Sequence, residues 1–272
     1  MSILRNTIVA GLVLLAPHLG GVSAAYADYP VAPDVVLFCE PTLRHAVADV
    51  AALWQKQTDV PVRVFTSPTS AMLQQIAHHA RDDVIIGEGE AAAATASAHQ
   101  LIKRETLRHL WRNELVVAAR GVDVEKASAG EKASTGPPGG TGKLAALAGK
   151  APIAIVDPWA ATAGADSEKA LQSLGLWQAV GENSTGVVDT EDASFLLTQA
   201  KVQLAIVYAT DVASNSALAV ADRLPAASYP PIVYWVAQTE HALSPNAAKF
   251  IAFLRSANAQ QRVRADGLEV LP

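Results

Sequence analysis

Hydroxyl side chains recur where a predicted strand gives way to a predicted helix. They are Thr42, the cluster at Ser67–Ser70, Thr162 and Thr190. A hydroxyl at such a joint ordinarily caps the helix, and this accounts for any one of them. Several at the carboxyl ends of parallel strands indicate more, because ligands bind at that edge of open α/β sheets and helix N-termini present free N–H groups there. Hydroxyls and amides alone could hold an anion at this edge.

Three other patterns favour ordinary structure over chemistry. The segment Gly139–Lys143 is glycine-rich, but it lacks the first glycine and the final hydroxyl of a phosphate loop. His78 and His79 are adjacent on a predicted helix, where their rings point about 100° apart and cannot share a metal ion. Cys39 and His45 have no evident orienting acid. Since no hydrolase or dinucleotide-binding motif is present either, we expect a non-enzymatic protein without catalytic residues, cofactor or metal.

Strands and helices alternate along most of the chain. Continuous apolar runs predict buried strands, and apolar residues at helical spacing follow them after short joints, which is typical of parallel βαβ units. We therefore expect an α/β fold with at least five helices. The seven predicted strands span residues 35–39, 62–65, 84–86, 115–119, 153–156, 204–208 and 232–236.

Polar residues mark the expected helix starts and one long connection. Ser167 and Thr190 each precede an acid and are expected to cap helices, and Ser244-Pro245 is expected to open the last one. Residues 121–143 are rich in Gly, Ser, Lys and Pro and hold almost no large apolar side chain, so we expect a flexible surface loop there.

The first 27 residues have the pattern of a secretory signal peptide. A basic start at Met1–Arg5 precedes an apolar run at Ile8–Leu15 and a small-residue cleavage site at Ala25–Ala27. The run is shorter than the roughly 20 residues that span a bilayer. We therefore expect cleavage before Asp28 and a mature protein in the periplasm.

Composition excludes several classes of protein. The chain has 272 residues, of which 50% are hydrophobic and 17% charged, and this excludes a disordered or collagen-like chain. Its 21 Lys and Arg face 26 Asp and Glu with no basic cluster, so we expect no nucleic-acid partner. The single cysteine, Cys39, cannot form an internal disulfide.

Several segments share the pattern of one protein family. They are Ile153–Pro158 with Thr162–Gly164, Glu168–Leu171 with Leu174–Trp177, Ile206–Asp211, Tyr229–Tyr234 and the ending from Asp266. These segments resemble the molybdate-binding periplasmic proteins of ABC importers, which belong to the type II class of solute-binding proteins. The likeness covers essentially the whole predicted mature chain.

The resemblance implies a two-lobed α/β fold of the type II periplasmic-binding-protein class. Each lobe would be a mostly parallel sheet flanked by helices, with the binding cleft between the lobes. The first lobe would hold residues 28–113 and 231–272, and the second would hold residues 114–230. The two chain crossings would act as a hinge. The expected protein is a monomer that delivers its solute to an ABC permease.

The resemblance also implies a set of ligand-binding residues. Family members hold a tetrahedral oxyanion, molybdate or tungstate, with two serines of the first lobe and with two amides and a tyrosine of the second. By position the first serine falls on Thr42, and the second falls on Thr69 or Ser70. The amides fall on Ala163 and Thr190, and the tyrosine is Tyr208. A site of neutral donors without lysine or arginine would not hold a dianion too tightly to release it.

Two departures from the family pattern leave alternatives open. The first loop reads Cys39-Glu40-Pro41 where the family has small alanines, and Glu88 replaces a small residue after the third strand. A carboxylate a few ångströms from a dianion repels it. Either Glu40 and Glu88 point away from the cleft, or the solute is a cation, an amine or an organic molecule. An exported accessory protein that kept the fold without transport is a further alternative.

Overall fold

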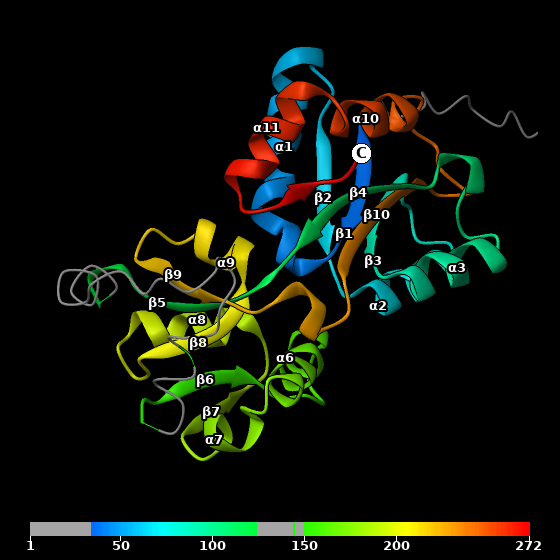
Figure 1. The fold of residues 1–272 in the computed structure, drawn as a ribbon. Helices are drawn as coiled ribbons and strands as arrows, with labels where there is room; N and C mark the ends of the chain where they lie inside the picture. The colour runs from blue at the N-terminus through cyan, green and yellow to red at the C-terminus, as the bar shows by residue number, and fades with distance from the viewer. Residues whose placement is uncertain (1–33, 124–143, 145–149) are drawn as a thin grey trace, which may run out of the picture. The chain divides into compact units, whose positions relative to one another are not determined.

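The computed structural model describes residues 34–123, 144 and 150–272 (Figure 1). The predicted signal peptide, residues 1–27, lies outside the described residues, and so does the predicted loop 121–143 except for its first three residues. Among the described helices, none combines the length and the apolar character that crossing a membrane requires. Both sheets described below belong to one compact unit, Val31–Pro272.

The first sheet has six strands in the order β11-β4-β10-β3-β1-β2. β1 pairs in parallel with β2 and with β3, whereas β10 is antiparallel to β3 and β4, and β11 is antiparallel to β4. The strands are β1 (Val35–Cys39), β2 (Val62–Thr66), β3 (Val84–Glu88), β4 (Arg108–Asn113), β10 (Ile232–Gln238) and β11 (Glu269–Val270).

The second sheet has five strands in the order β7-β6-β8-β5-β9. β6 pairs in parallel with β7 and β8, and β5 is antiparallel to β8 and β9. The strands are β5 (Leu115–Arg120), β6 (Ile153–Val156), β7 (Ser184–Val187), β8 (Leu204–Tyr208) and β9 (Leu218–Arg223).

The α/β class and all seven predicted strands are confirmed, but both sheets are mixed rather than mostly parallel. Each has three parallel strands, which the βαβ pattern predicted, and antiparallel strands beside them. Four strands lacked an apolar signal strong enough to predict. β7 is the clearest case, because its residues Ser184, Thr185 and Gly186 are exposed. The assignment of residues 28–113 with 231–272 and of residues 114–230 to two lobes stays a prediction.

Helices cover both faces of each sheet (Figure 1). On the first sheet they are α1 (Arg44–Thr58), α2 (Thr69–Ala77), α3 (Glu90–Ala98), α10 (Ala247–Leu254) and α11 (Ala257–Ala265), with short 3-10 turns η1 (Pro41–Leu43) and η2 (Arg104–Thr106). With the second sheet come α6 (Thr162–Ser173), α7 (Trp177–Gly181), α8 (Thr190–Thr198), α9 (Ala209–Ala213) and the turn η3 (Ala226–Ser228).

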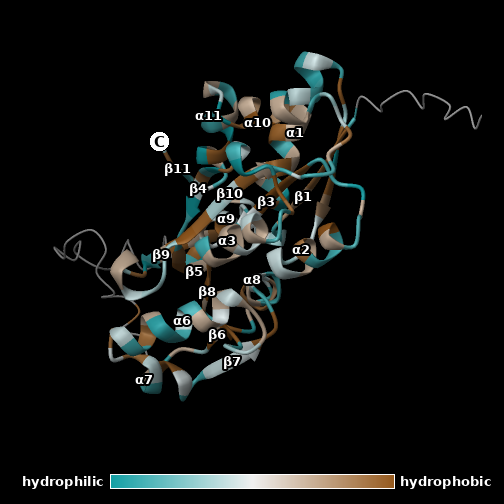
Figure 2. Cartoon of the chain, turned by 90° about the vertical axis from the view of Figure 1, so that its right-hand side faces the viewer, coloured by the Kyte–Doolittle hydropathy of each residue, from teal (hydrophilic) through white to brown (hydrophobic). Residues whose placement is uncertain are grey.

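The alternation of side chains along each strand divides the core into layers. Val35 and Leu37 of β1 pack in one apolar cluster with α1, α10 and α11, whereas Val36 and Phe38 pack in another with α2 and α3. The strands hold the most hydrophobic residues, drawn in brown, whereas the helices carry many of the hydrophilic residues, drawn in teal (Figure 2). Because both faces are buried, β1 reads as a continuous apolar run.

Two of the expected helix caps are wrong. Ser167 lies inside α6, where its hydroxyl donates to the Ala163 carbonyl at 2.6 Å, and α6 begins five residues earlier at Thr162. α8 is capped by Asp189, whose carboxylate accepts from the Asp192 N–H at 2.8 Å. An aspartate caps as well as a threonine, so the cap moved one residue upstream of Thr190.

Candidate functional site

A cavity of about 730 Å³ lies where strand ends and helix starts of both sheets meet. It contains every predicted ligand-binding residue except Thr69, and it contains both acids, Glu40 and Glu88. The predicted residues that line it are Thr42, Ser70, Ala163, Thr190 and Tyr208.

Thr69 lies immediately behind the cavity wall and holds the two acids together. It is the first residue of α2 and is buried. Its N–H donates to Glu40 Oε1 at 2.5 Å, and its hydroxyl donates to the same oxygen. The same hydroxyl accepts from the Glu88 N–H at 2.8 Å. Both donors of Thr69 are therefore occupied by a carboxylate of the protein itself.

Burial raises the pKa values of these two acids. The pKa of Glu88 rises to about 8, first because burial penalises its charged form and then because Glu40 and Asp166 lie nearby. Burial also raises the pKa of Glu40, and the two hydrogen bonds from Thr69 act in the opposite direction. Neither acid has a basic partner among the residues that the structure describes.

The expectation of a site without lysine or arginine is wrong, because Arg44 and Lys169 both line the cavity. Lys169 Nζ lies 3.7 Å from Asp166 Oδ1, and Arg44 lies 4.0 Å from Glu191. The misplaced start of α6 explains why Lys169 was not expected there, whereas Arg44 lies in α1. Thr162, Asp166 and Lys169 share one face of the helix only when it begins at Thr162.

The two tyrosines of the site remain hydrogen-bond donors. Burial raises the pKa of Tyr208 well above its usual range, and the nearby Glu88 carboxylate acts in the same direction. Tyr234, which the sequence did not suggest as a supporting residue, is fully buried, and its hydroxyl lies 3.0 Å from Thr42 Oγ1. Asn113 also donates to that hydroxyl, at 3.3 Å. Thr42 is therefore already held by a partner within the protein.

The loop before α6 forms another part of the wall. A side chain at Gly164 would collide with the backbone carbonyl of Asp157, so only glycine allows this helix start to pack against the end of β6. Trp159 lines the cavity and is 96% exposed. No sequence pattern predicted this exposure, since tryptophan in a loop is usually covered by packing.

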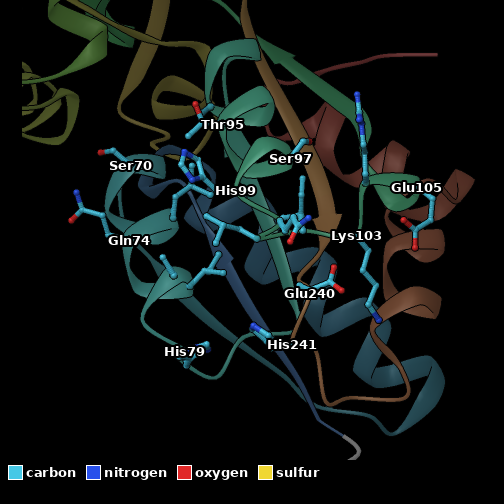
Figure 3. Close-up of a pocket in the computed structure, with 18 residues that line it drawn as sticks. Ser70, Gln74, His79, Thr95, Ser97, His99, Lys103, Glu105, Glu240 and His241 are labelled. Atoms are coloured by element: carbon cyan, nitrogen blue, oxygen red, sulfur yellow. The ribbon is translucent and has the colours of Figure 1, made fainter.

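A larger hollow, about 1370 Å³, lies between α2 and α3 (Figure 3). His79 and His241 lie side by side there, with ring centroids 5.1 Å apart. Its lining comes only from residues 70–105 and 240–241, and Ser70 is the one predicted site residue in it. No group of three or more metal-ligating side chains is found among the described residues. The hollow does not bring the predicted site residues together, so the smaller cavity is the candidate site.

The fold and the cavity define a class of protein. A model of the bacterial extracellular solute-binding proteins matches residues 35–269, and the chain belongs to this family. It is therefore a solute-binding protein rather than an enzyme, as the sequence predicted.

Individual relatives are more distant. The molybdate-binding protein ModA of Escherichia coli (strain K12) is 24% identical over 236 residues, which cover 87% of this chain and 89% of ModA. The substrate-binding domain of a putative molybdenum ABC transporter from Clostridium difficile has a TM-score of 0.71 at 20% identity, covering 88% of this chain and 99% of that chain.

A structure with a different ligand shares the same fold. PEB3, a Campylobacter jejuni protein solved with L-phospholactate bound, has a TM-score of 0.64 at 20% identity, covering 87% of this chain and 99% of that chain. At such identities the structures establish the type of fold, and the resemblance to periplasmic binding proteins is confirmed.

Proposed function

We propose that this protein captures a small solute in the cavity described above, in the periplasm, and delivers it to an ABC permease. The observation that carries the proposal is the convergence of residues from both sheets on one cavity. Glu40 and Thr42 come from the end of β1, whereas Ala163, Thr190 and Tyr208 come from joints of the second sheet. A solute that contacts both groups favours the arrangement in which they lie close together.

The chain crossings between the sheets support a hinge. The first crossing is the single residue Glu114, between β4 and β5, and the second lies between β9 and β10. The Glu114 carboxylate pairs with Arg223, and the Leu115 N–H donates to the Tyr229 hydroxyl at 3.1 Å. Two neighbouring crossings joined by such contacts would let the two sheets, each with its helices, rotate about one axis.

A tetrahedral oxyanion such as molybdate is the first candidate solute. The 24% identity with ModA and the donors at Ser70, Ala163 and Tyr208 favour it. Glu40 opposes it, because its carboxylate already accepts the two Thr69 donors and would repel a dianion. An oxyanion would have to displace the Glu40 carboxylate or bind while that carboxyl group holds a proton from solvent.

Calorimetry and solution scattering test the proposed function. Protein stripped of solute by partial unfolding and refolding is titrated with molybdate, tungstate and sulfate, and native mass spectrometry identifies any solute that copurifies. We expect a saturable binding signal with the true solute and a decrease in radius of gyration on binding. A protein that purifies empty, binds no solute of any class and never contracts would contradict the proposal.

An accessory role without transport predicts a different result. A search of the neighbouring genes for a permease and an ATPase identifies the candidate importer. Mixed with that importer, a transport protein should raise its ATPase activity when the solute is present. An accessory protein would bind solute and leave that activity unchanged.

A further inference from the structure

We infer that the solute is an organic cation, with its charged group against Glu40 and Glu88 and its apolar part against Trp159. The inference rests on the proposed function, since it concerns which solute the same cavity takes. Three features of the cavity carry it: its charge balance, the occupied donors of Thr69 and an exposed aromatic ring.

The first feature is an excess of acids over bases in the cavity lining. Six acidic residues line the cavity, against the two basic residues Arg44 and Lys169. Two of the acids are paired with a base, and two accept a backbone N–H at the start of their own helix. These contacts are Asp166 with Lys169, Glu191 with Arg44, Asp189 with the Asp192 N–H, and Asp211 with the Tyr208 N–H.

Glu40 and Glu88 are the other two acids, and neither is paired with a base among the described residues. Glu40 accepts only from the neutral donors of Thr69. Among the described residues, none donates a hydrogen bond to the Glu88 carboxylate. Two carboxyl groups that share one wall and have no basic partner repel each other unless a cation or a proton lies between them. The cavity therefore lacks positive charge at this wall.

The second feature is that Glu40 occupies the donors an anion would need. The N–H and the hydroxyl of Thr69 converge on one oxygen of its carboxylate, and Thr69 is one of the two residues to which the family resemblance assigns an oxyanion contact. An anion entering the cavity would find these donors taken and would lie beside negative charge. A cation would instead meet acceptor oxygens that are already held in position.

The third feature is Trp159, whose ring is 96% exposed at the cavity wall. The residues that the structure describes leave Trp159 almost uncovered, and an indole face attracts organic cations as well as apolar surface. A bare metal ion would not use such a ring, and the described residues hold no group of three metal ligands. A cavity of about 730 Å³ also has the size of sites that bind small organic molecules.

Calorimetric titration of purified full-length mature protein with putrescine and choline tests the inference, with molybdate and citrate as anionic probes. We expect saturable binding of at least one cation and of neither anion. Glu40→Gln and Glu88→Gln should each weaken cation binding at least tenfold, and Trp159→Ala at least threefold, because each removes one of the three contacts. Glu269→Gln is the matched control, since it removes a carboxylate far from the cavity lining and should leave affinity unchanged.

The outcomes separate the solute class from the proposed function. Binding of molybdate or citrate that tightens in Glu40→Gln would overturn the cation and leave solute capture standing. Failure of both cations to bind, together with a copurified neutral or anionic solute in the native mass spectrum, would do the same. An empty protein that binds none of the probes would overturn both proposals. Thermal denaturation of each variant, with a transition like that of the wild type, excludes misfolding as the cause of lost binding.

Discussion

The two ends of strand β3 carry acids in opposite environments. Asp83 directly precedes the strand, is completely buried and accepts three backbone N–H groups, from Val36 at 2.8 Å and from Leu243 and Ser244 at 2.7 Å each. Glu88 ends the strand, lines the cavity and accepts none from the described residues.

The difference distinguishes an acid that stabilises the fold from one that is available to a solute. Asp83 ties β1 and the chain after β10 to β3, and its charge is met by donors of the protein itself. Glu88 is kept close to Glu40 and Asp166 without such donors, which costs stability. A protein that retains an unfavourable acid in a cavity is expected to use it.

The largest effect is expected from Asp83→Ala. It leaves three N–H groups without an acceptor, those of Val36 and Ser244 in buried hydrogen bonds and that of Leu243 in a half-buried one, so the free energy of unfolding should fall by about 4 kcal/mol. Urea denaturation followed by circular dichroism measures the change, and Asp83→Asn, which keeps one acceptor oxygen, should lose less. A change under about 1 kcal/mol would remove the structural role assigned to Asp83.

Glu88→Gln should raise the free energy of unfolding relative to the wild type, and it should do so only as the pH rises. The pKa of Glu88 is raised from 4.5 to about 8, so in this window the folded protein holds a proton that the unfolded chain has lost. Stability is therefore lost as the pH rises from about 4.5 to 8, and the variant escapes this loss. Between pH 5 and pH 8 it should gain on the wild type by up to about 3 kcal/mol.

Thermal denaturation of both proteins across this pH range measures the gain. Glu40, Asp166, Tyr208 and Tyr234 also interact electrostatically with Glu88, so the variant has to be compared with the wild type at each pH. If the difference in stability between the variant and the wild type is the same at pH 5 and pH 8, Glu88 titrates as an exposed acid does.

The sequence predicted the place of this site better than its contacts. The apolar run of β3 ends where Glu88 stands, and the run of β1 ends before Glu40, so both acids could be placed at a sheet edge. The bond between Glu40 and Thr69 depends on the parallel register that pairs Cys39 with Thr66, and no local pattern encodes that pairing.

Other parts of the site could not be predicted because one element start was misplaced. With α6 expected to begin near Ser167, Asp166 fell outside the helix, and its pairing with Lys169 one turn later could not be foreseen. Trp159 gave no signal, since its exposure is a property of the folded loop alone. The expected oxyanion specificity came from resemblance, which transfers a fold more securely than the charge of a cavity.

Thr69→Val tests the link between the two cavity acids. The variant keeps the shape of the side chain but removes a hydroxyl that donates to Glu40 and accepts from the Glu88 N–H. The free energy of unfolding should fall by about 1–2 kcal/mol, which urea denaturation can resolve. Thr69→Ser keeps the hydroxyl and should recover most of the loss. Equal stability of the valine and serine variants would contradict the role of the hydroxyl.

The smallest effect is expected at Glu269, a third kind of acid. Its carboxylate lies 3.1 Å from Arg112, but 60% of the side chain is exposed and water screens the pair. Glu269→Gln should therefore change the free energy of unfolding by less than about 0.5 kcal/mol. Urea denaturation measures this change. A larger loss would mean that the distance to a basic partner decides the contribution of an acid to stability more than its burial does. A small effect at Glu269, beside a large one at Asp83, would mean that an acid stabilises this fold through buried hydrogen bonds rather than through an exposed ion pair.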